Sequence, residues 1–160
     1  MNITIKPAPI RKSLRVMTKP ERAFQVFTAR MHAWWPPEHS LLAGKPREDV
    51  IVEQRPGGRW YERATDGSEC NWGHVIAWEP PDRVLLAWQL DGTWSFNPDF
   101  LTEVEIRFIA DGPDATRVEL EHRNIERYGD QAETVRASLD SPDGWSTGLA
   151  RFAALANSPE

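Results

Sequence analysis

Residues 73–90 read GHVIAWEPPDRVLLAWQL, two apolar runs that flank a Pro-Pro-Asp corner. Proline does not continue a central strand, so the corner predicts two strands that run back along each other. Each run carries one tryptophan, Trp78 in the first and Trp88 in the second. Side chains of this size can fill a core or line the wall of a binding cavity, and this stretch alone leaves both readings open.

Strand-like runs separated by short turns continue on both sides of this hairpin. The expected strands cover residues 10–17, 49–54, 59–64, 69–78, 83–90, 101–110 and 115–123. Turn sequences such as Arg55-Pro56-Gly57-Gly58 and Asp111-Gly112-Pro113-Asp114 join consecutive runs. Short strands connected in this way predict an antiparallel meander.

Helical segments lie on both sides of the meander. The first, after residue 18, has apolar residues at helical spacing (Phe24, Phe27, Met31 and Trp34) and ends at Pro36-Pro37. Near the C-terminus, residues 130–139 have helix-forming composition, and Ser141-Pro142-Asp143 has the pattern of a new helix start. The expected fold class is α+β, with a curved antiparallel sheet wrapped around a long C-terminal helix and short helices after the first strand closing one end.

The composition is that of one globular domain covering residues 1–160, with 40% apolar and 27% charged residues. The net charge is −5 and the 19 Lys and Arg residues are scattered, so nucleic acid is not an expected partner. No apolar run is long enough for a membrane span and the N-terminus lacks a signal peptide, so we expect a cytoplasmic protein. The single cysteine, Cys70, excludes an internal disulfide, and we expect it to be a buried structural residue.

Alternation along the strands assigns their faces. Apolar and charged side chains alternate in residues 102–108 and 116–122, so one face of the sheet is exposed to solvent and the other packs against the core. The inward set along the first half of the hairpin is expected to be Trp72, His74, Ile76 and Trp78. On this register Trp78 and Trp88 face the same interior, beneath the last helix. A register slip of one residue would invert these faces.

Several local phrases occur in a characteristic order along nearly the whole chain, from residue 10 to residue 155. They are TKPERAFQVFT, the AWW that ends the first helix, RPGGRWYE, GHVIAWEPPDRVLLAW, TRVELEH and DGWSTGLARFAAL. In this order they resemble the activator of Hsp90 ATPase homologue-like family of the START/Bet v 1-type (SRPBCC) helix-grip superfamily. Each phrase is weakly specific alone, and together they indicate the fold much more strongly than the function.

The resemblance implies a cavity between the sheet and the C-terminal helix. Superfamily members often bind lipids, polyketides, hormones or other apolar molecules there, and some are cyclases or hydrolases. Eukaryotic relatives stimulate the ATPase of a heat-shock chaperone, but we expect a single domain here, without the separate N-terminal chaperone-binding domain of such activators. The family name therefore does not by itself predict the function.

We expect a small-molecule binding protein that holds an apolar or aromatic ligand without a cofactor. Large interior side chains and a few fixed polar groups are typical of such cavities. The expected ligand-binding residues are Phe27, Met31, Trp34, Trp60, Glu62, His74, Trp78, Trp88, Phe108, His122, Trp145 and Phe152. The tryptophans could equally fill the interior completely, because protein cores normally leave no void of ligand size.

Three polar residues of that set, Glu62, His74 and His122, fall on expected inward faces. A carboxylate beside an imidazole in an apolar cavity could act as an acid–base pair, which would make the protein a cyclase- or hydrolase-like enzyme. The simpler reading is that each is a hydrogen-bonded core or rim residue, and an intermediate reading is that they orient a ligand. A third function class is a chaperone-related interaction module, which predicts a filled interior and a large exposed patch.

The remaining candidates are weaker. The four histidines are far apart and none has zinc-type spacing with a second ligand, so no metal site is expected. Glu38 and His39 could line a cavity mouth, although a solvated loop is the favoured reading. Trp94, in the loop DGTWSFNPDF, could gate an entrance or contact a partner subunit, and a homodimer is compatible with the sequence.

Overall fold

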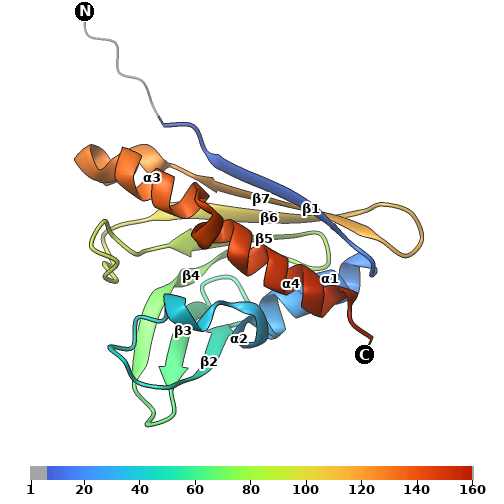
Figure 1. Ribbon diagram of the computed structural model, residues 1–160, viewed down its shortest axis with the longest axis horizontal. Helices are drawn as coiled ribbons and strands as arrows, with labels where there is room; N and C mark the ends of the chain where they lie inside the picture. The colour runs from blue at the N-terminus through green and yellow to red at the C-terminus, as the bar shows by residue number, and fades with distance from the viewer. Residues whose placement is uncertain (1–6, 160) are drawn as a thin grey trace, which may run out of the picture.

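The computed structural model describes residues 7–159 of this chain. Seven strands form one antiparallel sheet in the order β1-β7-β6-β5-β4-β3-β2. The strands are β1 (Ile10–Val16), β2 (Arg47–Val52), β3 (Arg59–Ala64), β4 (Glu69–Glu79), β5 (Arg83–Trp88), β6 (Thr102–Ala110) and β7 (Thr116–Arg123). The sheet is strongly bent, so that β2, β3 and β4 turn away from the plane of the other strands (Figure 1).

Helices cover the concave face of the sheet. Between β1 and β2 lie α1 (Pro20–Ala29), α2 (Met31–Trp34) and the 3-10 turn η1 (Pro37–His39). After β7 come η2 (Ile125–Gln131), α3 (Ala132–Asp140), the wide turn η3 (Pro142–Ser146) and α4 (Thr147–Asn157). Figure 1 shows α3 and α4 running in succession across the sheet, with α1 at the far end of α4. This arrangement confirms the predicted α+β helix-grip fold, and the helix start predicted at Ser141-Pro142 divides the C-terminal helix into two.

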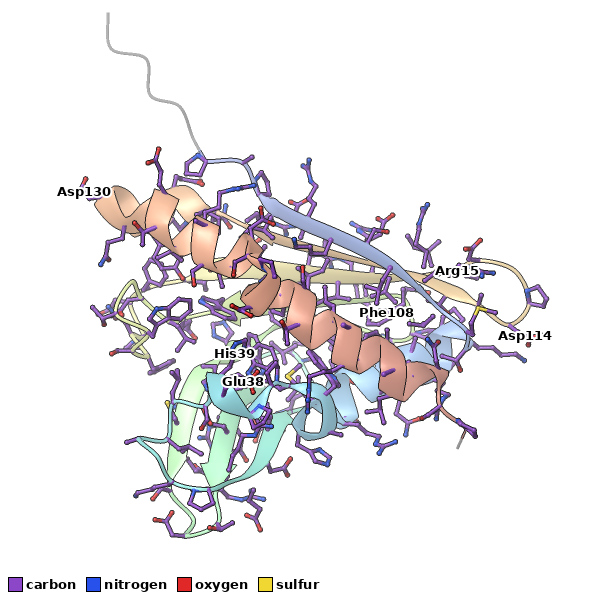
Figure 2. The ribbon with its side chains drawn as sticks, in the orientation of Figure 1. Arg15, Glu38, His39, Phe108, Asp114 and Asp130 are labelled. Carbon is purple, nitrogen blue, oxygen red and sulfur yellow. The ribbon has the colours of Figure 1, made fainter. Side chains whose placement is uncertain are left out.

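Aromatic rings fill the interior at the α1 end. Phe27 packs edge-to-face on Phe108 of β6 at 5.8 Å and on Phe152 of α4 at 5.3 Å. Phe24 packs on the same Phe108 ring at 5.2 Å between ring centroids. Figure 2 shows Phe108 within this layer, between the sheet and the helices. This end of the molecule is therefore an ordinary close-packed core.

The face assignment along β4 is wrong at two positions, because β4 contains two β-bulges. Pairing with β3 steps from Asn71 to Gly73, and pairing with β5 steps from Val75 to Ala77. Each extra residue shifts the alternation by one position. Val75 is therefore buried opposite Leu86, while the predicted inward residue Ile76 is 37% exposed.

His74 is the second residue whose face changes. It pairs with Ala87, which in turn pairs with Glu103 on the charged face of the sheet. Its Nδ1 lies 2.7 Å from Oε1 of Gln89. His74 therefore belongs to the outer face of the sheet and not to the interior.

The two tryptophans of the opening hairpin have different surroundings. Trp78 is partly exposed and packs edge-to-face on Phe24 of α1, with 4.9 Å between ring centroids. Trp88 is 4% exposed and packs 5.7 Å from Trp145, just before α4. Trp78 thus belongs to the filled end of the interior, and Trp88 to the opposite end.

The convex face of the sheet is held by a network of ion pairs. Arg123 of β7 contacts Glu103 at 2.9 Å and Glu105 at 3.1 Å, and Arg83 of β5 also pairs with Glu105. Such cross-strand pairs keep this face solvated and fix the register of the strands. Within residues 7–159, no helix is both long and apolar enough to cross a lipid bilayer.

Gly73 permits the close contact between β4 and β5, which yields a test of the observed register. A Cβ atom at this position would lie 1.7 Å from the carbonyl oxygen of Ala87. We expect Gly73→Ala to lower the free energy of unfolding by about 2–4 kcal/mol, because the strands must separate to accept the methyl group. Urea unfolding followed by circular dichroism measures this loss. Ile76→Thr, at an exposed position of the same strand, should change stability by less than about 0.5 kcal/mol, and equal effects of the two substitutions would contradict this register.

Candidate functional site

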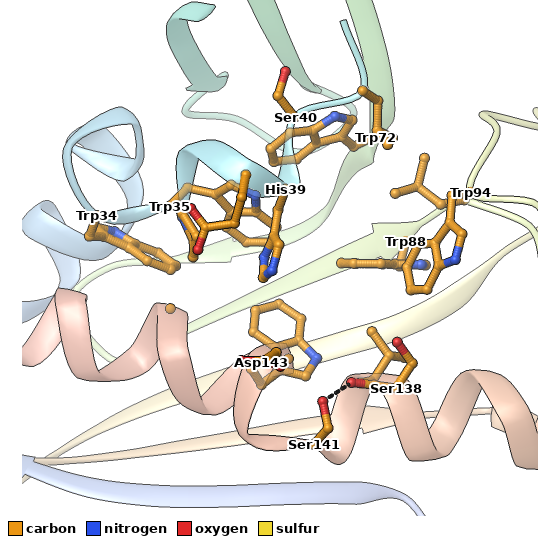
Figure 3. A pocket seen from close by; sticks show the side chains of 18 residues that line it. Trp34, Trp35, His39, Ser40, Trp72, Trp88, Trp94, Ser138, Ser141 and Asp143 are labelled. Atoms are coloured by element: carbon orange, nitrogen blue, oxygen red, sulfur yellow. Dashed lines mark hydrogen bonds between the residues drawn. The ribbon is translucent and has the colours of Figure 1, made fainter. Parts of the chain in front are cut away.

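A pocket of about 340 Å³ opens at the end of the interior opposite α1. It lies between the loop after α2, the ends of β4 and β5, and the break between α3 and α4 (Figure 3). Its walls are formed by Trp34, Trp35, Pro36, Glu38, His39, Ser40, Leu41, Trp72, Trp88, Leu90, Trp94, Ser138, Leu139, Ser141, Asp143, Gly144, Trp145 and Gly148. A volume of this size is at the lower end of the range for small-molecule sites.

Six tryptophans contribute to the pocket wall. Trp35 packs on Trp72 at 4.8 Å and on Trp145 at 5.6 Å between ring centroids. Trp88 packs on Trp145 at 5.7 Å and on Trp94 at 6.5 Å. Figure 3 shows these rings around the pocket, with Trp94 at the end farthest from Trp34. The rings hold one another in place and present a continuous aromatic surface.

Two arginines hold the loop after α2 in place through hydrogen bonds to its carbonyl groups. Arg47 donates hydrogen bonds to the carbonyl oxygens of His32 (3.3 Å), Trp35 (2.8 Å) and Pro36 (3.2 Å). Arg151 of α4 donates to the carbonyl oxygen of Trp34 at 2.9 Å. The carbonyl groups at the end of a helix have no partners within it, and arginine satisfies them here. These bonds fix the backbone that carries Trp34 and Trp35.

The break in the C-terminal helix forms the opposite wall. Pro142 follows the end of α3, and Gly144 has non-helical angles (φ −88°, ψ −130°) within η3. A Cβ atom on Gly144 would lie 2.2 Å from the carbonyl oxygen of Leu139, so the chain can turn this tightly only with glycine. Gly148 supports the same wall from α4, where a Cβ atom would approach Trp34 to 3.3 Å.

Glu62 lies behind the pocket wall and binds residues that form it. Its carboxylate is fully buried and accepts hydrogen bonds from Ser40 Oγ (2.6 Å), the Leu41 amide (2.8 Å) and Trp72 Nε1 (2.7 Å). Three donors satisfy most of the acceptor capacity of the group and compensate for its desolvation. The carboxylate thereby joins the loop after α2 to a tryptophan of the pocket wall.

His122 holds a second tryptophan of the wall. Trp145 Nε1 donates to His122 Nδ1 at 3.1 Å, and His122 Nε2 lies 2.8 Å from Thr102 Oγ1. An indole nitrogen only donates, so Nδ1 must be the acceptor and the proton of the neutral ring is on Nε2. Complete burial lowers the pKa of His122 to about 3, because the charged form is not solvated there.

The structure brings only part of the predicted site to the pocket. Of the predicted ligand-binding residues, Trp34, Trp88 and Trp145 line it. Glu62 and His122 lie behind the wall, each with its own hydrogen-bond partners. The others pack elsewhere in the interior (Phe27, Met31, Trp60, Phe108, Phe152), lie beneath α1 (Trp78) or face outward (His74). The proposed acid–base pair of Glu62 and His74 is not formed, because these residues are on opposite faces of the sheet.

Several residues of the pocket were not expected from the sequence. Trp35, Trp72, Leu41 and the turn at residues 138–144 all contribute to the wall, and Glu38 and His39 line it instead of forming a purely solvated loop. The AWW sequence before Pro36 was the available signal for Trp35, since the proline ends the helix where the second tryptophan begins. Trp94 also lines the pocket.

The chain matches the model of one protein family and is similar to several solved structures. Residues 17–157 match the family model described as "Activator of Hsp90 ATPase homolog 1-like protein". An anthrahydroquino-γ-pyrone synthase, Txn09, is 41% identical over 93% of this chain and 97% of its own, with a TM-score of 0.66. CalC, a self-sacrificing resistance protein from Micromonospora echinospora, is 30% identical over 93% and 94% of the two chains, with a TM-score of 0.68.

A more distant structure shares only the fold. DynU16, from the dynemicin biosynthetic locus, is 17% identical over 93% of this chain and 47% of its own, with a TM-score of 0.60. No curated protein matches the chain.

The hydrogen bonds of Glu62 lead to a test with two substitutions. Glu62→Gln keeps an oxygen for the Leu41 and Trp72 N–H groups and can donate to Ser40 Oγ, so we expect a change of less than about 1 kcal/mol in stability. Glu62→Leu leaves both N–H donors buried without an acceptor, and we expect a loss of about 2–4 kcal/mol. Thermal and urea unfolding of the two variants measure the difference. Equal losses would show that these hydrogen bonds do not hold the pocket wall.

The lowered pKa of His122 predicts a specific loss of stability in mild acid. The unfolded chain takes up a proton near the ordinary histidine pKa, whereas the folded protein does so only near pH 3. Stability is therefore nearly complete at pH 7.5 and falls as the pH drops through 6.5 toward 3, by about 1.4 kcal/mol between pH 7.5 and 5.5. Urea unfolding at the two pH values measures this loss.

Two histidine variants serve as controls for that measurement. His122→Asn is expected to be less stable at pH 7.5 but to lose the pH dependence in this window. His39→Gln, which alters a partly exposed imidazole, should keep the dependence of the natural protein. A pH dependence that persists in His122→Asn would assign the effect to another group.

Proposed function

Because this chain belongs to the activator of Hsp90 ATPase homolog 1-like family, we propose that it binds a small planar aromatic molecule in the pocket lined by tryptophans. The observation that carries the proposal is the contrast between the two ends of the interior. Rings close the α1 end completely, whereas at the other end the rings of Trp35, Trp72 and Trp88 border open space. Aromatic walls of this kind favour a flat ligand that stacks on them.

The similar proteins support this ligand class. The synthase that shares 41% identity is named for an anthrahydroquino-γ-pyrone, which is a polycyclic aromatic compound. The two chains correspond over almost their whole lengths, which supports extending this ligand class to the present chain. We therefore propose a polycyclic aromatic ligand of small size, in accordance with a pocket of about 340 Å³.

An enzyme acting on such a ligand is the second candidate, favoured by the similarity to a synthase. The residue best placed for proton transfer is His39, which lines the pocket and whose ring points into it in Figure 3. Imidazole is the side chain most often used for general acid–base catalysis. Glu62 and His122 are less suitable, because their polar atoms are engaged in hydrogen bonds with residues of the wall.

A chaperone-related interaction module has less support. That function predicted a filled interior and a large exposed patch. The large exposed apolar residues among those described are Met17, Ile76, Trp94 and Ile109, which come from separate elements. An open pocket fits a small ligand better than it fits a protein partner.

Blocking the pocket tests the proposed binding. We expect a neutral polarity-sensitive dye such as Nile red to bind with saturable enhancement of its fluorescence and to be displaced by tricyclic aromatic compounds. Leu41→Trp places a bulky indole ring in the pocket, and it should weaken the binding of the dye and of the competing compounds at least about tenfold. The readouts are dye fluorescence and quenching of intrinsic tryptophan fluorescence.

A matched substitution outside the pocket controls for nonspecific effects. Leu101→Trp introduces the same ring at a partly buried leucine that does not line the pocket, and it should leave binding within about twofold. Equal loss in both variants, or no saturable binding by the natural protein in its folded state, would refute the proposal.

A further inference from the structure

The buried tryptophans differ in how their indole N–H groups are satisfied. Four of them donate a hydrogen bond within the protein: Trp34 to the Phe27 carbonyl (3.1 Å), Trp60 to Met31 Sδ (3.2 Å), Trp72 to Glu62 (2.7 Å) and Trp145 to His122 (3.1 Å). Among the residues described, the buried indole nitrogens of Trp35 and Trp88 have no such partner. Both of these tryptophans line the pocket.

A buried donor without an acceptor is costly, so its position is informative. Trp35 is 7% exposed and Trp88 is 4% exposed, which leaves each indole nitrogen inaccessible to bulk water. Removing an amide-like N–H from water without a new hydrogen bond destabilises the folded state. Unsatisfied groups in an otherwise well-bonded interior are therefore candidates for contact with a ligand.

Trp35 is the stronger candidate for a hydrogen bond with a ligand. Burial raises the pKa of Tyr128 to about 12, and the neighbouring Trp88 indole and Thr102 hydroxyl partly offset this, although Trp88 Nε1 makes no hydrogen bond. Tyr128 itself donates to the carbonyl oxygen of Leu90 at 2.8 Å. A small rotation of Trp88 could give its N–H an acceptor within the protein. Trp35 packs on the rings of Trp34, Trp60, Trp72 and Trp145, and its indole nitrogen has no hydrogen-bond partner.

The charge of the wall restricts the acceptor that a ligand can offer. The described residues that line the pocket include the carboxylates Glu38 and Asp143 but neither lysine nor arginine. A carboxylate or phosphate on the ligand would therefore be buried beside like charge without a lysine or arginine to pair with it. A neutral oxygen, such as that of a ketone, quinone or pyrone, accepts a hydrogen bond from indole without this penalty.

We propose that the ligand is a neutral aromatic molecule whose ring carbonyl oxygen accepts a hydrogen bond from Nε1 of Trp35, after a rotation of the indole that turns this buried nitrogen toward the open space of the pocket. This inference rests on the proposed function and adds the polar group by which the pocket recognises and orients its ligand. The stacked rings of the wall supply most of the affinity, and Trp35 distinguishes a carbonyl compound from the corresponding hydrocarbon.

Two probes that differ only in the carbonyl group test the inference. Fluorene and 9-fluorenone share a planar tricyclic frame, and displacement of Nile red gives the affinity of each. Trp35→Phe keeps an aromatic ring but removes the N–H, and it should lower the ratio of fluorenone to fluorene affinity about fivefold to tenfold. Trp94→Phe, at the exposed rim of the same pocket, should weaken both probes equally and leave the ratio within about twofold.

A measurement on the natural protein covers the case in which Trp35→Phe does not fold. With the indole nitrogens labelled with ¹⁵N and assigned, fluorenone should move the Trp35 Hε1 resonance downfield, and fluorene should not. If both probes bind but neither the ratio nor this resonance responds to the carbonyl, the inference is wrong and the proposed function stands. If neither probe displaces the dye from folded protein, the proposed function itself fails.

Discussion

The buried carboxylate of Glu62 is the interaction on which the pocket depends. It joins three parts of the chain that are distant in sequence: the loop at Ser40 and Leu41, strand β3, and Trp72 on the bulge of β4. An uncompensated charge in this position would be strongly destabilising, so the donors must stay in place whenever the protein is folded. The same constraint keeps the loop from collapsing into the space beside it. A group that resembled a catalytic acid in the sequence thus acts as a structural support.

The tryptophan content has a related explanation. Six of the eight tryptophans are buried, and four of those satisfy their N–H within the protein, each with a different type of acceptor. The surplus of large rings fills the α1 end and also lines the pocket. Both readings offered by the opening hairpin therefore apply, Trp78 to the filled end and Trp88 to the open one.

The fold could be predicted from local features because each depends on residues close together in the sequence. Turn sequences, strand alternation and the Ser141-Pro142 helix start all belong to this class, and they located every strand and the division of the C-terminal helix. The faces along β4 could not be predicted, since a bulge depends on pairing with neighbouring strands and leaves no clear mark in the sequence. The site was predicted only in part for the same reason: Trp35, His39 and the turn at Gly144 meet through tertiary packing alone.

The division of the C-terminal helix has a consequence for how this scaffold can change. The pocket exists because the backbone turns aside between Asp140 and Trp145, and not because core side chains are small. Ser138, near the end of α3, and Asp143, on this turn, are exposed to solvent while they border the pocket. Substitutions there can alter which molecules enter without repacking the aromatic core. A lineage built on this architecture is thereby free to exchange one small molecule for another while the filled core beneath α1 stays unchanged.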